Sequence, residues 1–247
     1  MTVHSVTTNQ VDIYKNLEAV VRKYATTTFL RPVADHTREA FEHACEFVRE
    51  FYGTDAAKCV EMVLDSGCGT GESTLHLARK FPNVPVIGID KSAVRLSKAG
   101  NERQLKVSSG ESSETSLEVP ANAFWVRAEL LDFWRLALEK VNAGEWKILH
   151  HALYYPNPWP KESEATRRFH LHPIFPTLLR LSPVTELRTN WEIYAREFTE
   201  AAHTLGDELS LKFDVEFGAF NPENPETAFE RKYKEARQQL WRTLVKA

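Results

Sequence analysis

One short stretch combines a carboxylate with three closely spaced glycines. The segment 63–71 reads V-L-D-S-G-C-G-T-G and places Asp65 ahead of Gly67, Gly69 and Gly71. An apolar run precedes this segment and a helix-like run follows it directly. This pattern predicts a strand, a glycine turn and a helix, which is a geometry that brings backbone close to a ligand. The residues therefore indicate a binding site built from backbone, with an acid beside it.

The glycine turn lacks the motifs of two common nucleotide-binding sites, and this limits the ligands it could bind. It has no Gly-Lys-Ser/Thr of a phosphate-binding loop, and its G-x-G-x-G spacing is not that of a dinucleotide site. Asp65 would repel a pyrophosphate but suits an amine-bearing or cationic ligand. The run 84–90 predicts the next strand, and Asp90 at its end is placed to accept both hydroxyls of a ribose. A turn that serves only strand-to-helix packing is the alternative, and two acids at successive strand ends disfavour it.

An acidic glycine turn followed by a ribose-binding acid resembles the class I S-adenosylmethionine (SAM)-dependent methyltransferases. This resemblance implies SAM as the cofactor. The alternation of strand and helix from residue 59 onward favours the same fold, a doubly wound, Rossmann-like and mostly parallel sheet. Two amphipathic helical patterns precede it. We therefore expect an N-terminal helical extension at 1–57 and a methyltransferase domain at 58–247.

Composition limits the other classes. The 247 residues carry a net charge of −3, so global charge does not indicate nucleic-acid binding, which would depend on local patches. The three cysteines, Cys45, Cys59 and Cys68, form neither a disulfide framework nor a zinc pattern and suit a reducing compartment. We see no signal peptide and no apolar run of membrane-spanning length. We expect a cytoplasmic protein with no metal and no membrane partner.

A proline-rich loop, Y-P-N-P-W-P-K at 155–161, follows the predicted fourth strand. Its three prolines predict a rigid, mostly extended loop at the carboxyl edge of the sheet, where ligands bind in such folds. The loop is similar to the P-D-P-W-x-K loop of the bacterial tRNA (guanine-N7)-methyltransferase family. Further motifs of that family follow in order, namely T-R-R before H-P at 166–173, T-N-W-E-I-Y at 189–194 and T-A-F-E at 227–230. The resemblance runs from about Val60 to the end and leaves out the N-terminal helices.

The resemblance implies a set of site residues. Those expected to bind the cofactor are Asp65, Gly67, Gly69, Gly71, Asp90, Glu129 and Asn157. Asn157 is also the candidate catalytic residue, since its position in the family faces both methyl donor and guanine. Those expected to bind the substrate are Lys161, Arg167, Arg168, Asn190, Thr227, Phe229 and Glu230. For the two arginines the expected contact is with phosphates, and a solvated basic helix start is the alternative.

Asn157 and Asn190 depart from the family, which has Asp at both positions. A carboxylate accepts from two guanine N–H donors at once, whereas Asn accepts with one oxygen only. Guanine selectivity is then weakened, or the acid role has moved to Glu186, Glu192 or Glu230. The sequence favours SAM-dependent methylation of RNA, most specifically 7-methylguanosine formation in tRNA, with tRNA or another structured RNA as partner. The alternatives are a methyltransferase with another substrate and a catalytically silent SAM- or RNA-binding protein. The oligomeric state is not predicted.

Overall fold

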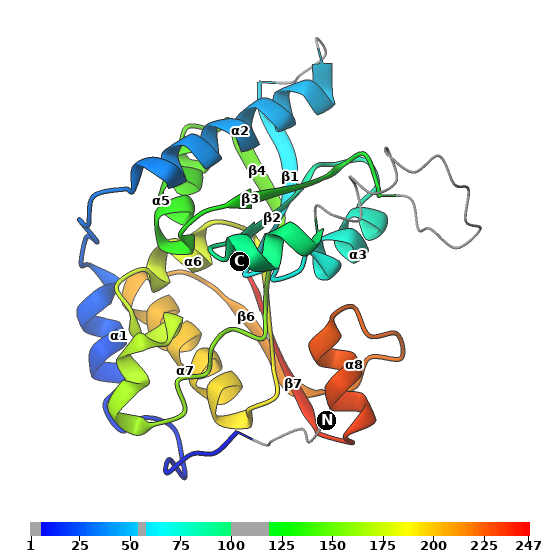
Figure 1. Ribbon diagram of the computed structural model, residues 1–247. Helices are drawn as coiled ribbons and strands as arrows, with labels where there is room; N and C mark the ends of the chain where they lie inside the picture. The colour runs from blue at the N-terminus through cyan, green and yellow to red at the C-terminus, as the bar shows by residue number, and fades with distance from the viewer. Residues whose placement is uncertain (1–5, 54–57, 100–118) are drawn as a thin grey trace. The chain divides into compact units, whose positions relative to one another are not determined.

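The computed structural model describes residues 6–53, 58–99 and 119–247. Its seven strands are ordered β3-β2-β1-β4-β5-β7-β6 in one sheet (Figure 1). The pairs β1–β2, β2–β3 and β4–β5 are parallel, whereas β7 runs antiparallel to both β5 and β6. This arrangement is the Rossmann-like sheet of class I methyltransferases, and it confirms the predicted fold class.

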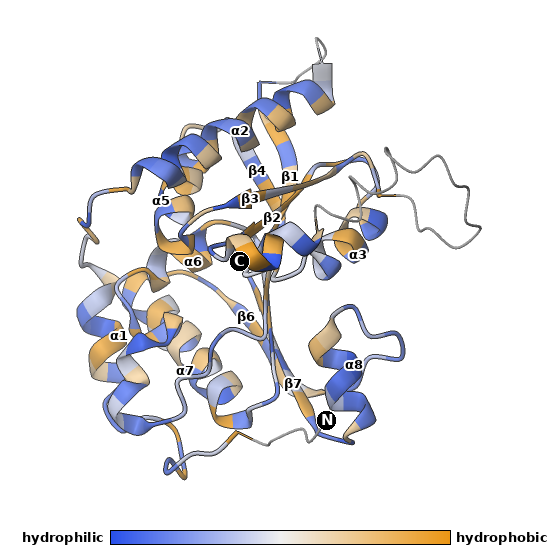
Figure 2. Ribbon diagram, viewed as in Figure 1, coloured by the Kyte–Doolittle hydropathy of each residue, from blue (hydrophilic) through white to orange (hydrophobic). Residues whose placement is uncertain are grey.

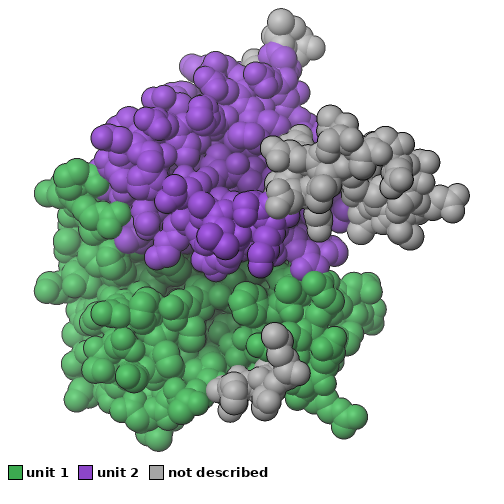
Figure 3. Space-filling view, viewed as in Figure 1, with its two compact units in different colours: residues 1–32, 149–247 green, residues 33–148 purple. Residues whose placement is uncertain are grey.

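The chain divides into two compact units, which Figure 3 shows in different colours. One unit comprises residues 33–148, and the other comprises 1–32 together with 149–247. The elements of unit 33–148 are α2 (Asp35–Tyr52), β1 (Val60–Ser66), α3 (Glu72–Lys80), β2 (Val86–Asp90), β3 (Ala123–Arg127), α5 (Leu130–Asn142) and the start of β4 (Trp146–Tyr154). Residues 93–99 are also helical.

The core of unit 33–148 follows from its sequence pattern. Every residue of β2 is buried, as expected for a central strand covered on both faces. Helix α2 is mostly hydrophilic in Figure 2 and buries only a narrow stripe, which includes Phe41 and Val48. The ring of Phe41 lies edge-on to Phe133 of α5 at 5.0 Å, and α2 also packs on β3. Helices α2 and α5 therefore form a packed layer beside β3.

The second unit contains the rest of β4 and most of the later elements. They are α1 (Leu17–Ala25), η2 (Glu162–Arg167), η3 (Phe169–Leu171), α6 (Phe175–Arg180), β5 (Val184–Thr189), α7 (Glu192–Leu209), β6 (Asp214–Phe220), α8 (Ala228–Glu235) and β7 (Leu240–Lys246). Helix α7 buries a broad face that includes Phe198 and Leu205, and α1 packs against it. Trp191 occupies the N-cap position of α7, so Asn190 lies just before the helix.

The two N-terminal helices lie in different units, since α1 packs on α7 and α6 while α2 packs on β3 and α5. The proposed division of the chain into 1–57 and 58–247 stays a prediction. Within the described residues, no helix combines the length and apolar character needed to cross a membrane.

Candidate active site

The glycine turn follows β1 directly and is fastened to the end of β2. The amides of Gly67 and Cys68 both donate to the carbonyl of Ile89, at 2.7 and 3.1 Å. Gly67, Gly69 and Gly71 have φ values of +79°, +59° and +81°. L side chains rarely adopt such torsions, so the path of the turn depends on glycine.

The three glycines differ in what surrounds them. A Cβ on Gly71 would lie 2.4 Å from Nε1 of Trp125 and 2.8 Å from the Cβ of Ala99. A Cβ on Gly67 or Gly69 would meet no atom within 4 Å. Gly71 therefore serves packing, which is the alternative considered for the whole turn. The other two present bare backbone to open space, as a ligand-binding turn requires.

Asp65 stands at the carboxyl end of β1 and is 1% exposed. Its Oδ2 accepts hydrogen bonds from the hydroxyls of Ser73 at 2.7 Å and Thr74 at 2.6 Å, both in the first turn of α3. The neighbouring Cys68 is buried, and burial together with the charges of Asp65 and Asp90 raises its pKa well above the usual thiol value. The thiol is therefore neutral and adds no charge to the turn.

Asp90 ends β2 and holds the turn from the other side. Its Oδ2 accepts from the Gly69 amide at 3.1 Å, and its Oδ1 accepts from the Ser92 amide at 2.7 Å. Arg95 lies 3.1 Å from the same Oδ1. The carboxylate thus orders the middle glycine of the turn directly. Its contact with a ribose stays a prediction.

Glu129 follows β3 and forms the N-cap position of α5. Its backbone amide donates to Thr37 Oγ1 at 3.0 Å, whereas its half-buried carboxylate makes no hydrogen bond or ion pair within the described part of the chain. Because β1, β2 and β3 are parallel, Asp65, Asp90 and Glu129 lie at one edge of the sheet. Three carboxylates and an open glycine turn fit a ligand rich in amino and hydroxyl donors, as SAM is.

The proline-rich loop lies in the other unit, after β4. Tyr155 donates its amide to the Arg188 carbonyl of β5 at 2.7 Å, which anchors the start of the loop. The exposed Asn157 turns its Oδ1 toward the Trp159 amide at 3.3 Å. Asn190, half-buried, follows β5, which is parallel to β4, so both asparagines are at the same edge. The structure thus brings the two residues that depart from the family to one edge of this unit.

Two basic residues of this region are exposed, and one is not. Lys161 is exposed at the end of the loop. Arg167 lies over the Trp159 ring at 4.6 Å and pairs with Glu164 at 3.2 Å. Arg168, which the sequence analysis expected to contact a phosphate, is 0% exposed and has its guanidinium in a network within its own unit. Only the first two present charge to a ligand in solution.

The T-A-F-E segment begins α8. Thr227 Oγ1 accepts from the Glu230 amide at 3.0 Å and so caps the helix. Glu230 is fully buried, and its Oε1 accepts from Tyr155 Oη at 3.1 Å and from Arg188 at 2.9 Å. Phe229 is 49% exposed, with its ring 5.9 Å from that of Tyr155. Thr227 and Glu230 are therefore buried and stabilise the segment, whereas Phe229 is its exposed aromatic residue.

Sequence reasoning missed Arg188, the buried centre of this region. It pairs with Glu186 at 2.8 Å and lies over the ring of Tyr154 at 3.9 Å, in addition to its contact with Glu230. Burial raises the pKa of Glu186, but the hydrogen bond from His150 and the Arg188 charge outweigh it and hold that pKa below its usual value. The sequence E-L-R places Glu186 and Arg188 on the same face of a strand, and this spacing could have indicated their ion pair. Of the three glutamates considered as replacement acids, Glu192 alone is exposed.

A mostly parallel sheet with one antiparallel strand near its end, a glycine turn after β1 and acids after the first three strands define a class I SAM-dependent methyltransferase. The chain belongs to the family described as "Putative methyltransferase", whose model matches residues 60–243. No group of three or more His, Cys, Asp or Glu side chains that could hold a metal occurs in the described residues.

The chain is similar to a tRNA (guanine-N(7)-)-methyltransferase of Nitrosomonas europaea, with 29% identity over 177 residues that cover 69% of each protein. A shorter match, 46% over 56 residues, is to a trans-aconitate 2-methyltransferase of Deinococcus radiodurans and spans 22% of each protein. A solved structure described as an antibiotic related methyltransferase superposes with a TM-score of 0.50 at 14% identity, covering 91% of this chain and 98% of that one. This last likeness shows the fold alone.

Proposed function

We propose that this protein transfers a methyl group from SAM to N7 of a guanine in tRNA. The observation that carries the proposal is the proline-rich loop P-N-P-W-P-K, which follows β4 at the sheet edge that also carries the start of the T-N-W-E-I-Y motif at the end of β5. The similarity to a tRNA (guanine-N(7)-)-methyltransferase over 69% of the chain supports the same substrate. In this proposal Asp65, Gly67, Gly69, Asp90 and Glu129 bind the cofactor.

The proposed reaction requires no proton transfer by a side chain. Guanine N7 carries a lone pair and no proton, so it attacks the sulfonium methyl without a general base, and the C–S electron pair stays on sulfur. The contribution of the protein is then mainly proximity and alignment. In this proposal Asn157 orients the base by hydrogen bonding, and the stiff loop fixes the direction of its amide.

The exposed side chains near the loop suit RNA. Lys161 and Arg167 offer positive charge to phosphates, which fixes register without reading sequence. Phe229, about half exposed beside Tyr155, offers a ring on which a splayed base could stack. Helix α8, mostly hydrophilic in Figure 2, adds Lys232 and Lys234 in its last turn.

A second candidate is methylation of another substrate, and the orientation of Asn157 favours it specifically. With its Oδ1 directed at the Trp159 amide, the side chain is left to present its NH2 group, a donor. A donor matches a carbonyl acceptor on a base better than it matches the guanine N–H groups.

Methyl transfer from labelled SAM into tRNA by the wild type, Asn157→Asp and the control Asn221→Asp tests the proposal. If guanine N–H groups are read at this position, Asn157→Asp should hold or raise kcat/KM, since a charged acceptor strengthens the contact. The control, on an exposed loop, should match the wild type. A loss of activity in Asn157→Asp alone would favour the second candidate. Tight SAM binding without transfer in any variant would leave a silent binding protein.

A further inference from the structure

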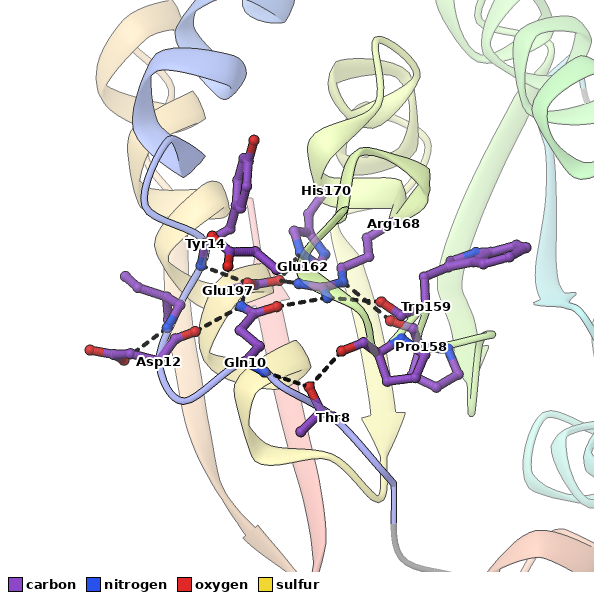
Figure 4. A network of polar contacts seen from close by, with 12 residues as sticks. Thr8, Gln10, Asp12, Tyr14, Pro158, Trp159, Glu162, Arg168, His170 and Glu197 are labelled. Atoms are coloured by element: carbon purple, nitrogen blue, oxygen red, sulfur yellow. Dashed lines mark hydrogen bonds and ion pairs between the residues drawn. The ribbon is translucent and has the colours of Figure 1, made fainter. Parts of the chain in front are cut away.

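Three successive carbonyls of the proline-rich loop each accept a hydrogen bond from a side chain (Figure 4). Arg168 donates from Nε to Pro158 O at 3.2 Å and from Nη2 to Trp159 O at 2.8 Å. The hydroxyl of Thr8 donates to Pro160 O, 152 positions away in sequence. The backbone of the loop is thus held from outside the loop, at every residue from 158 to 160.

The loop needs such support for two reasons. Its prolines lack N–H groups, so it has few amides with which to join a strand, and carbonyls remain as points of attachment. In addition, Tyr155 and Trp159 have φ values of +52° and +46°. Non-glycine residues persist in this left-handed region only where the surrounding structure over-determines them. The bond from Arg168 falls on Trp159, one of these two residues.

Arg168 is itself held by a buried network. Its Nη1 pairs with Glu197 Oε2 of α7 at 2.6 Å, and the same oxygen lies 2.8 Å from Nε2 of His170. Gln10 accepts from Arg168 Nη2 at 2.8 Å and donates to Glu197 Oε1 at 2.7 Å. The guanidinium is therefore held in one orientation by Glu197 and Gln10, with its Nε and Nη2 groups also donating to the loop (Figure 4).

The N-terminal segment, residues 8–14, completes this network. Tyr14 donates its amide to Glu197 Oε1 at 2.7 Å, and Asn9 Oδ1 accepts from the Glu162 amide at 3.4 Å, just after the loop. The segment lies outside residues 60–243, which the family model matches. Residues beyond the family region thus fix the loop that carries Asn157.

We propose that the N-terminal segment and Arg168 are positioning elements, which hold the proline-rich loop in the orientation that presents Asn157 and Lys161 to the substrate. This inference rests on the proposed function, because it takes the loop as the substrate loop. None of these residues touches the reacting atoms in this account. Their effect is on the geometry of the loop alone.

Thr8→Val tests the proposal with little change of volume, because it removes the hydroxyl that bonds Pro160. Thr8→Ser restores a hydroxyl, and Thr7→Val makes the same change at the exposed neighbouring position. Tryptic cleavage after the exposed Lys161, read by mass spectrometry, reports opening of the loop. We expect cleavage to accelerate and kcat for tRNA methylation to fall, each by about 2- to 10-fold, the range for one lost hydrogen bond. Thr8→Ser should have a cleavage rate and a kcat near those of the wild type. The SAM Kd and the melting temperature should be unchanged in both Thr8 variants.

Equal cleavage rates in Thr8→Val and Thr7→Val would overturn the inference, whatever the activity. Faster cleavage with unchanged kcat in an active enzyme would overturn it as well, since the held loop would then not matter to the reaction. If Thr8→Val lowers the melting temperature as well as kcat, Thr8 contributes to the stability of the fold and does not act on the loop alone, which would also overturn the inference. If the wild type does not methylate tRNA, the proposed function fails separately, and cleavage still decides whether the segment holds the loop.

Discussion

Alanine substitutions at two glycines of the same turn should impair different properties of the protein. Gly69 and Gly71 both have positive φ, but only Gly71 has neighbours where a Cβ would lie. Gly144, before β4, is a matched control, since it also has positive φ and open space but lies outside the turn. Gly69→Ala should impair SAM binding, Gly71→Ala should impair folding, and Gly144→Ala should cost only backbone strain.

The magnitudes follow from the geometry. An L residue in the left-handed region costs roughly 1–2 kcal/mol, which all three variants incur. For a domain of this size that lowers the melting temperature by about 2–8 °C. Gly71→Ala adds the 2.4 Å contact with Trp125, an overpacking cost of about 1–3 kcal/mol more. In Gly69→Ala the methyl group enters the space assigned to the ligand, so a similar cost appears as SAM affinity weakened about 5- to 150-fold.

Thermal unfolding and calorimetric titration with SAM separate these effects. We expect Gly69→Ala and Gly144→Ala to unfold at similar temperatures, with only Gly69→Ala weakened in SAM binding. Gly71→Ala should unfold at the lowest temperature of the three. Normal SAM affinity in a folded Gly69→Ala protein would mean that the open side of the turn does not face the cofactor.

Three further predictions concern charge. Asp90→Ala should weaken SAM binding by about 1–3 kcal/mol, and calorimetry showing wild-type affinity in the folded variant would remove Asp90 from the site. Lys161→Ala with Arg167→Ala should weaken tRNA binding and flatten its salt dependence while SAM Kd holds, and an unchanged slope would assign both to the solvated surface. Burial, with a smaller effect of a neighbouring histidine, lowers the pKa of His151 from 6.5 to about 3. As pH falls, His151 therefore takes up a proton in the unfolded state before it does so in the folded state. The free energy of unfolding then decreases by about 1.4 kcal/mol per pH unit between pH 6.5 and 3. Urea unfolding between pH 7 and 4.5 should show a shallower loss in His151→Leu than in the exposed control His203→Gln, and equal slopes would contradict this.

The sheet was predictable because its signals are local. The strand that ends at Asp90 is predicted from a short, mostly apolar run, and the structure places β2 there. The glycine turn likewise follows from spacing within nine residues. The sequence could not show which of the three glycines packs and which two face open space, since the contact that restricts Gly71 comes from Trp125, more than fifty positions later.

The roles of charged residues were less predictable, because burial depends on distant partners. Arg167 and Arg168 are equivalent in sequence, yet one is exposed and the other is bound to Glu197 and to Gln10, 158 positions away. Glu230 likewise has its carboxylate directed at Arg188, 42 positions earlier. A sequence motif identifies such residues but does not show whether they face a ligand or support the residues that do.

Nucleoside mass spectrometry of tRNA incubated with purified protein and SAM decides whether the protein methylates N7 of guanine. We expect 7-methylguanosine in the treated tRNA, formed only when SAM is present. Methyl label in a different nucleoside, or no methylated nucleoside despite SAM binding, would contradict it.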